Sequence, residues 1–196
     1  MKKQLTPLMI IHMIVMVGLM VCNVFAMVTF FGSFRAATAH AERLEALMNG
    51  ILMLVILAML VTGVLYLWKR YAKQAAGWYK AFLLLQVAVS VLTIIIDVFI
   101  SKQNALLITR SSLYVGKTIL LLILAFWKDL GKKKTWILFY ILLALDICGL
   151  LAAIIFMSKH GFDFRFVGFV TALIADGTIG LSIRGKYEDK DARGTI

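Results

Sequence analysis

Six long apolar blocks constrain the fold of this chain more than any other feature of its sequence. A helix that crosses a bilayer needs about 20 mostly apolar residues, with a range of roughly 17 to 25. We therefore predict an all-α integral membrane protein, built as a bundle of six transmembrane helices. The predicted spans lie near residues 7–31, 49–68, 80–100, 111–127, 135–157 and 166–184.

The connections between these blocks are short, so we expect residues 1–196 to form a single polytopic membrane domain. Only 16% of the residues are charged, whereas a soluble domain has about 25%. The first block is longer than the apolar core of a cleaved signal peptide, so we expect the first span to be retained.

The net charge of +11 is distributed unevenly among the connections. Fourteen Lys and Arg residues lie in segments 1–6, 69–80, 128–134 and 184–196, against six in 32–48, 101–110 and 158–165. By the positive-inside rule, this alternation places both termini in the cytoplasm. We therefore expect a multi-pass protein of the plasma membrane, with the lipid bilayer as its surroundings and no nucleic-acid partner.

No pattern of metal ligands or cofactor-binding residues is present in the sequence. The three histidines, His12, His40 and His160, lie in different segments, and no HExxH spacing occurs. Cys22 and Cys148 fall within predicted spans and have no CxxC partner, which is typical of small apolar filler residues. We expect neither a metal nor a cofactor.

Four ionisable residues, Asp97, Lys117, Asp146 and Asp176, lie well inside the predicted spans, where a charge is unfavourable and usually marks a function or a partner. Asp97 and Lys117 lie near the same end of two consecutive spans, which we expect to pack as an antiparallel hairpin. We therefore predict an ion pair between them. The alternative is that Lys117 extends toward the lipid headgroups.

The last two spans suggest a second charged pair. Asp146 and Asp176 are each fifteen residues from Gly161 in the turn between these spans, which predicts matching heights near the membrane midplane. Small residues share their faces: Gly149 and Ala153 on one span, and Gly168, Ala172 and Gly180 on the other. Such seams allow helices to approach closely, so we expect Asp176 to face protein. A carboxylate pair of this kind can exchange a proton or hold a cation.

The third span carries a polar stripe. Gln86, Ser90, Thr93 and Asp97 are separated by four, three and four residues, which places them on one helical face. Such a face lines a water-filled cavity or a polar contact between helices. On the first span, His12 and Asn23 share nearly one face, which is a weaker signal.

These residues favour a small transporter or a solute-binding transport subunit, with Asp146 and Asp176 as its proton, cation or substrate site and the third-span stripe along the approach. The solute would be small and either cationic or proton-coupled. The size and six-span layout are similar to those of the substrate-binding subunits of energy-coupling-factor vitamin transporters, in architecture and without a shared motif.

Two alternatives remain open at this point. The chain is an accessory or assembly subunit, or a homo-oligomer, if its intramembrane charges meet a partner helix. An intramembrane enzyme with an aspartate dyad is the third possibility. However, "LALDICG" around Asp146 and "IADGTIG" around Asp176 lack the YD and GxGD elements of intramembrane aspartyl proteases. We therefore expect a protein that is not an enzyme.

Overall fold

The computed structural model describes residues 6–70, 75–101, 105–127, 130–161 and 165–191, and this part of the chain is all-helical. Six of its helices are long and apolar enough to cross a membrane, as predicted. The elements are α1 (Pro7–Ala36), α2 (His40–Trp68), α3 (Ala75–Ile95), the π-helical turn η1 (Ile96–Ile100), α4 (Ala105–Phe126), α5 (Lys132–His160) and α6 (Arg165–Asp191).

The helices extend beyond the apolar blocks. Thr6 caps the start of α1 by accepting a hydrogen bond from the Met9 amide, and Pro7 occupies the first turn, where its missing N–H is not needed. At the other end, only residues 37–39 separate α1 from α2. The polar sequence from His40 onward therefore forms the first turns of α2, whereas hydropathy suggested a loop there.

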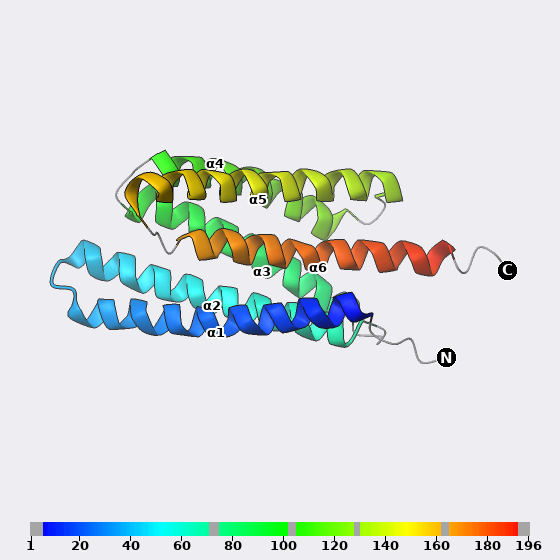
Figure 1. Ribbon diagram of the computed structural model, residues 1–196, viewed down its shortest axis with the longest axis horizontal. Coiled ribbons are helices and arrows are strands. Elements are labelled where there is room, and N and C mark those ends of the chain that lie inside the picture. Colours follow the sequence, from blue (N-terminus) through cyan, green and yellow to red (C-terminus); the bar gives the residue numbers. More distant parts are fainter. Residues whose placement is uncertain (1–5, 71–74, 102–104, 128–129, 162–164, 192–196) are drawn as a thin grey trace.

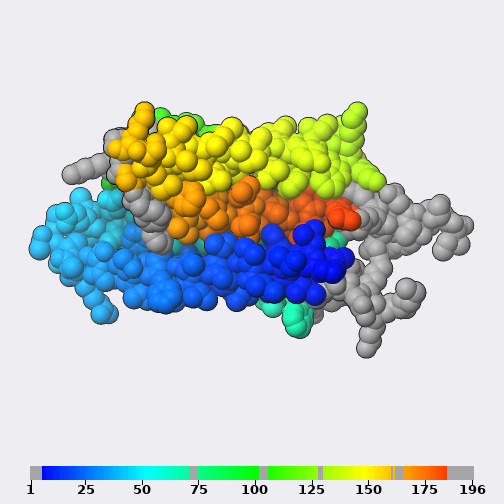
Figure 2. Space-filling view, viewed as in Figure 1, coloured from blue at the N-terminus to red at the C-terminus, as the bar shows by residue number. Residues whose placement is uncertain are grey.

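Consecutive helices run antiparallel and pack against each other, and α6 closes the bundle by packing against α1 as well as α5. Figure 2 shows the face on which α6 lies between α1 and α5. The helix α1 begins, and α6 ends, at one end of the bundle (Figure 1), which we call the terminal end. The α1–α2 connection lies at the opposite end, which we call the far end.

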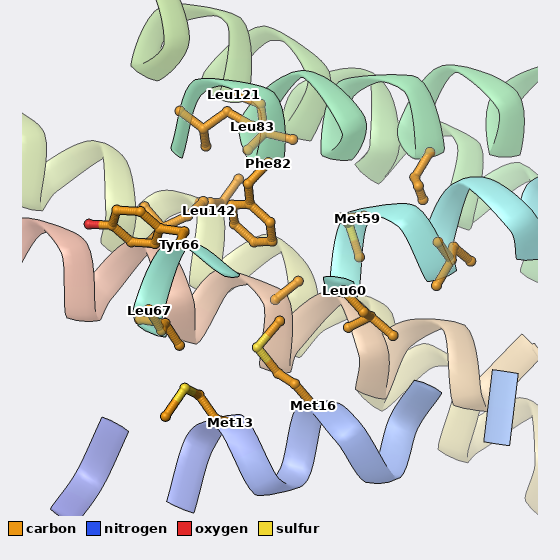
Figure 3. Packing of buried hydrophobic residues seen from close by; sticks show 14 of the residues in the cluster. Met13, Met16, Met59, Leu60, Tyr66, Leu67, Phe82, Leu83, Leu121 and Leu142 are labelled. Carbon is orange, nitrogen blue, oxygen red and sulfur yellow. The ribbon is translucent and has the colours of Figure 1, made fainter. Parts of the chain in front are cut away.

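The half of the bundle nearer the terminal end is filled with apolar side chains from all six helices. Figure 3 shows part of this packing, where residues of α1 and α2 meet residues of α3, α4 and α5. Its largest fully buried members include Met9, Met16, Leu60, Leu67, Phe82, Leu83, Leu121, Leu142 and Ile179. These buried side chains make the core of this half largely apolar.

Close packing of α5 against α6 confirms part of the predicted small-residue seam. A Cβ atom added to Gly149 would overlap the ring of Phe169, and one added to Gly180 would lie 2.8 Å from Phe139 Cζ. Gly168, however, has nothing within 4 Å of such an atom. The seam therefore brings the two helices together at Gly149 and Gly180, whereas Gly168 faces open space.

We expect Gly149→Ala to destabilise the bundle by about 1–3 kcal/mol, because the buried Phe169 ring must move to admit the methyl group. Thermal unfolding of the purified protein in detergent would measure this. Gly18→Ala is the matched control, since nothing lies within 4 Å of its added Cβ. Equal stability of the two variants would contradict the close packing of α5 on α6.

Candidate functional site

A buried group of four side chains lies at mid-height in the bundle, and we call it the charged cluster: Gln86 of α3, Lys117 of α4, Asp146 of α5 and Asp176 of α6. Lys117 Nζ donates to Asp146 Oδ2 at 2.7 Å and Oδ1 at 2.9 Å, and to Asp176 Oδ2 at 3.2 Å. The three charged side chains are at most 5% exposed. The cluster therefore links four helices in the interior.

The prediction that Asp146 and Asp176 come together at matching heights agrees with this geometry, because both carboxylates contact the same ammonium. Lys117 is the cation that the two acids hold. The expected Asp97–Lys117 pair is wrong, and so is the extension of Lys117 toward the headgroups, since this residue is 3% exposed. Similar depth in consecutive helices therefore did not predict the partner of Lys117.

Asp97 pairs instead with Arg110, a residue that sequence reasoning had placed in the connection before the fourth span. Arg110 donates through Nε to Asp97 Oδ2 at 2.6 Å and through Nη2 to Asp97 Oδ1. Because α4 begins at Ala105 and not near residue 111, Arg110 lies within the helix and is 8% exposed. The π-helical turn η1 carries Asp97, and such turns often occur at functional sites.

A cavity of about 380 Å³ extends from the far end of the bundle to the charged cluster. Near the far end its lining includes Ser33 and Glu42, which are exposed. At mid-height its lining includes Gln86 and Lys117, which are buried. It is thus a one-sided cavity, with an outer end at the surface and an inner end at Gln86 and Lys117. Asp146 and Asp176 lie behind these two residues and are not part of its lining.

The polar stripe of the third span lines this cavity, which was one of its two predicted roles. Gln86, Ser90 and Thr93 are part of the lining, and Asp97 reaches it through Arg110. Ser90 and Thr93 donate their hydroxyl hydrogens to backbone carbonyls one turn earlier, at 2.9 and 2.8 Å. Their oxygen atoms therefore remain acceptors toward the cavity.

Antiparallel packing of α3 and α4 arranges the polar side chains of the cavity in order of depth. Gln86 and Lys117 meet through Asp176 at the inner end, and Asp97 meets Arg110 nearer the outer end. Seven residues separate Lys117 from Arg110 on α4. At about 1.5 Å per residue, the two ion pairs lie roughly 10 Å apart along the bundle.

The weaker two-residue signal on the first span does not describe a single site. Asn23 lines the cavity and donates to the Met53 carbonyl oxygen at 2.6 Å. His12 lies nearer the terminal end, with its Nε2 atom 3.0 Å from Thr178 Oγ1 and its ring against Gly177. Only Asn23 therefore belongs with the cavity.

The charged cluster has an imbalance of charge. Two carboxylates and one ammonium, all ionised, leave one negative charge in the interior. Gln86 donates to Asp176 Oδ1 at 3.1 Å but adds no charge. Because an uncompensated charge in low-dielectric surroundings is unfavourable, the cluster favours the addition of one proton or one monovalent cation.

No protein-family model, curated protein or solved structure matches this chain.

Proposed function

We propose that this chain is an integral protein of the plasma membrane, with both termini in the cytoplasm. Six apolar helices of sufficient length support this proposal, as does the distribution of basic residues between the two ends. Because Arg110 lies inside the bundle, the sequence assigns five other basic residues to the far-end connections, against fourteen to the terminal-end segments. The asymmetry that predicts orientation is therefore stronger than in the sequence alone.

Within that membrane, we propose that the chain is a small transporter or a solute-binding transport subunit. The single observation that carries this proposal is the cavity, which starts at the far end and stops at the charged cluster. Its volume of about 380 Å³ lies within the range of small-molecule sites, roughly 300–1,000 Å³. In the proposed orientation it accepts a solute from outside the cell.

Asp146 and Asp176 remain the proposed proton or cation site, now with Lys117 as a built-in partial counter-charge. A proton that joins the cluster cancels its surplus negative charge, and so does a cationic solute. Either event alters the contacts that link α4 to α5 and α6. This gives a physical connection between occupancy of the cavity and the packing of the helices.

Filling the cavity tests the proposal. Gly168 lines the cavity and has nothing within 4 Å of an added Cβ atom, so Gly168→Leu is expected to occupy the space without disturbing the fold. We expect this variant to reduce uptake to the background of cells that lack the protein. Gly18→Leu is the matched control, because Gly18 also has open space but lies outside the cavity lining.

The measurement is depletion of small solutes from the medium by whole cells, followed by mass spectrometry, with Asp146→Asn and Asp176→Asn, singly and together, in the same screen. We expect the Asn variants to lose uptake of the solute that the wild type depletes. Unchanged uptake in Gly168→Leu and in all three Asn variants would remove the proposal.

The charges inside the bundle no longer favour an assembly role. That role required unpaired acids inside the membrane, but Asp97, Asp146 and Asp176 each contact a basic side chain of the same chain. An aspartate dyad is likewise disfavoured, because Lys117 binds both carboxylates of the proposed pair. Transport of a solute is the function that the cavity supports best.

A further inference from the structure

One hydrogen-bond acceptor at the inner end of the cavity has no donor. Gln86 is 2% exposed, and its Oε1 atom has no partner among the described residues. Its Nε2 atom donates to Asp176 Oδ1, and an ionised carboxylate accepts but cannot donate, so with Asp176 ionised the Oε1 atom of Gln86 is the one left over. A buried acceptor without a donor is unfavourable and requires an explanation. A ligand that brings an N–H or O–H group to Gln86 would supply the missing donor.

The neighbouring charges determine which kind of donor is favoured. Lys117 makes three hydrogen bonds among the described residues, all to Asp146 and Asp176. Its N–H groups are thus directed at the acids, and the cluster keeps its surplus negative charge. A donor that also carries one positive charge satisfies Gln86 Oε1 and neutralises the cluster in a single step.

The rest of the lining indicates the shape of the remaining ligand. Between the cluster and the outer end of the cavity, apolar side chains form much of the wall, and the buried ring of Tyr114 lies among them. These apolar residues are Leu19, Leu52, Met53, Ile56, Met59, Val89 and Ala175. The positive charge of Arg110 is already met by Asp97, and the outer end carries the exposed carboxylate of Glu42. An apolar body with a cationic head therefore fits this cavity.

We propose that the cavity binds a primary amine with a compact apolar body, whose ammonium group donates to Gln86 Oε1 and neutralises the charged cluster. This inference rests on the proposed solute-binding function and names its substrate class. The ammonium lies at the inner end of the cavity, and the apolar body lies against the wall formed by α1, α2 and α3. The amine thereby takes the place of the proton that otherwise compensates the cluster.

Three probes of nearly equal size and different charge test this assignment: 2-phenylethylamine, 2-phenylethanol and 3-phenylpropanoate. Equilibrium binding to the purified full chain in detergent, near neutral pH, would use the radiolabelled amine and alcohol directly and the acid as a competitor. We expect the amine to bind about tenfold or more tightly than the alcohol, because a charged hydrogen bond is stronger than a neutral one. The acid is expected to compete least.

Two variants separate the charge of the cluster from the acceptor. Asp176→Asn removes the surplus negative charge, and Gln86→Met removes the acceptor at similar side-chain volume. Each is expected to lower amine affinity by about tenfold and to leave alcohol affinity nearly unchanged, so that the alcohol reports an intact cavity. Gly18→Leu is again the control that alters neither probe.

Equal affinity of the wild type for amine and alcohol would overturn the assignment to amines but leave solute binding in place. A parallel loss of amine and alcohol binding in both variants would also overturn it, since a structural role alone predicts that result. Absence of binding for all three probes would reject the class as well. The uptake comparison between Gly168→Leu and Gly18→Leu decides the underlying transport function separately.

Discussion

Lys117→Met is expected to destabilise the bundle by about 3–5 kcal/mol, because it leaves two buried carboxylates without their cation. Asp146 and Asp176 are 4% and 0% exposed and do not line the cavity, so their carboxylates have little access to water that could replace the lost ammonium. The measurement is unfolding of the purified protein in detergent, by heat or by increasing denaturant. We expect this to be the largest effect of any single substitution in the cluster.

The triple variant Lys117→Met, Asp146→Asn and Asp176→Asn provides the control for this prediction. It removes all three charges at nearly constant volume, so we expect it to regain most of the stability that Lys117→Met alone loses. Lys133→Met, at an exposed position of α5, is expected to have no effect. If the triple variant were as unstable as the single one, packing and not charge would explain the role of Lys117.

Arg110→Met is expected to cause a loss of similar size, about 3–5 kcal/mol, because Asp97 is 1% exposed and depends on this guanidinium. Adding Asp97→Asn to the Arg110 variant removes the orphaned charge, so the double variant is expected to be more stable than Arg110→Met alone. A double-mutant cycle, measured by the same unfolding assay, isolates the coupling between the two side chains.

Independent, additive effects of the Asp97 and Arg110 substitutions would contradict the ion pair. The uptake and binding assays add a second readout, because Arg110 lines the cavity whereas Asp97 does not. A stable double variant with altered binding would assign Arg110 a direct contact with the solute. Unaltered binding would limit the pair to holding η1 against α4.

Hydropathy was sufficient to predict six helices in this chain, but it could not locate their ends. A window of apolar residues marks the part of a helix suited to lipid, whereas a helix continues through any residues that can maintain its hydrogen bonds. The segment from His40 to Asn49 illustrates the difference, since it is polar enough to resemble a loop and nevertheless forms the start of α2. Such polar turns are where Glu42 and Glu45 contribute to the cavity.

The sequence predicted the level of the site along the bundle axis, but it did not predict which side chains form ion pairs. Equal distances from Gly161 placed Asp146 and Asp176 at one level, and the structure brings both to Lys117. The same reasoning failed for Asp97, because it ignored the rotation of each helix about its axis and began α4 too late to include Arg110. The cavity depends on side chains from five helices, so no single periodic pattern could have predicted its shape.

The one-sided cavity has an electrical consequence in the proposed orientation. In that orientation, an electrolyte-filled cavity would place most of the membrane voltage across the apolar half between the charged cluster and the terminal end. An ion that reaches Lys117 has therefore crossed little of the electric field. A unit charge that continues inward crosses nearly all of it, which is worth about 2.3 kcal/mol per 100 mV. In that orientation, the membrane potential would act mainly on the step beyond the cluster and little on binding.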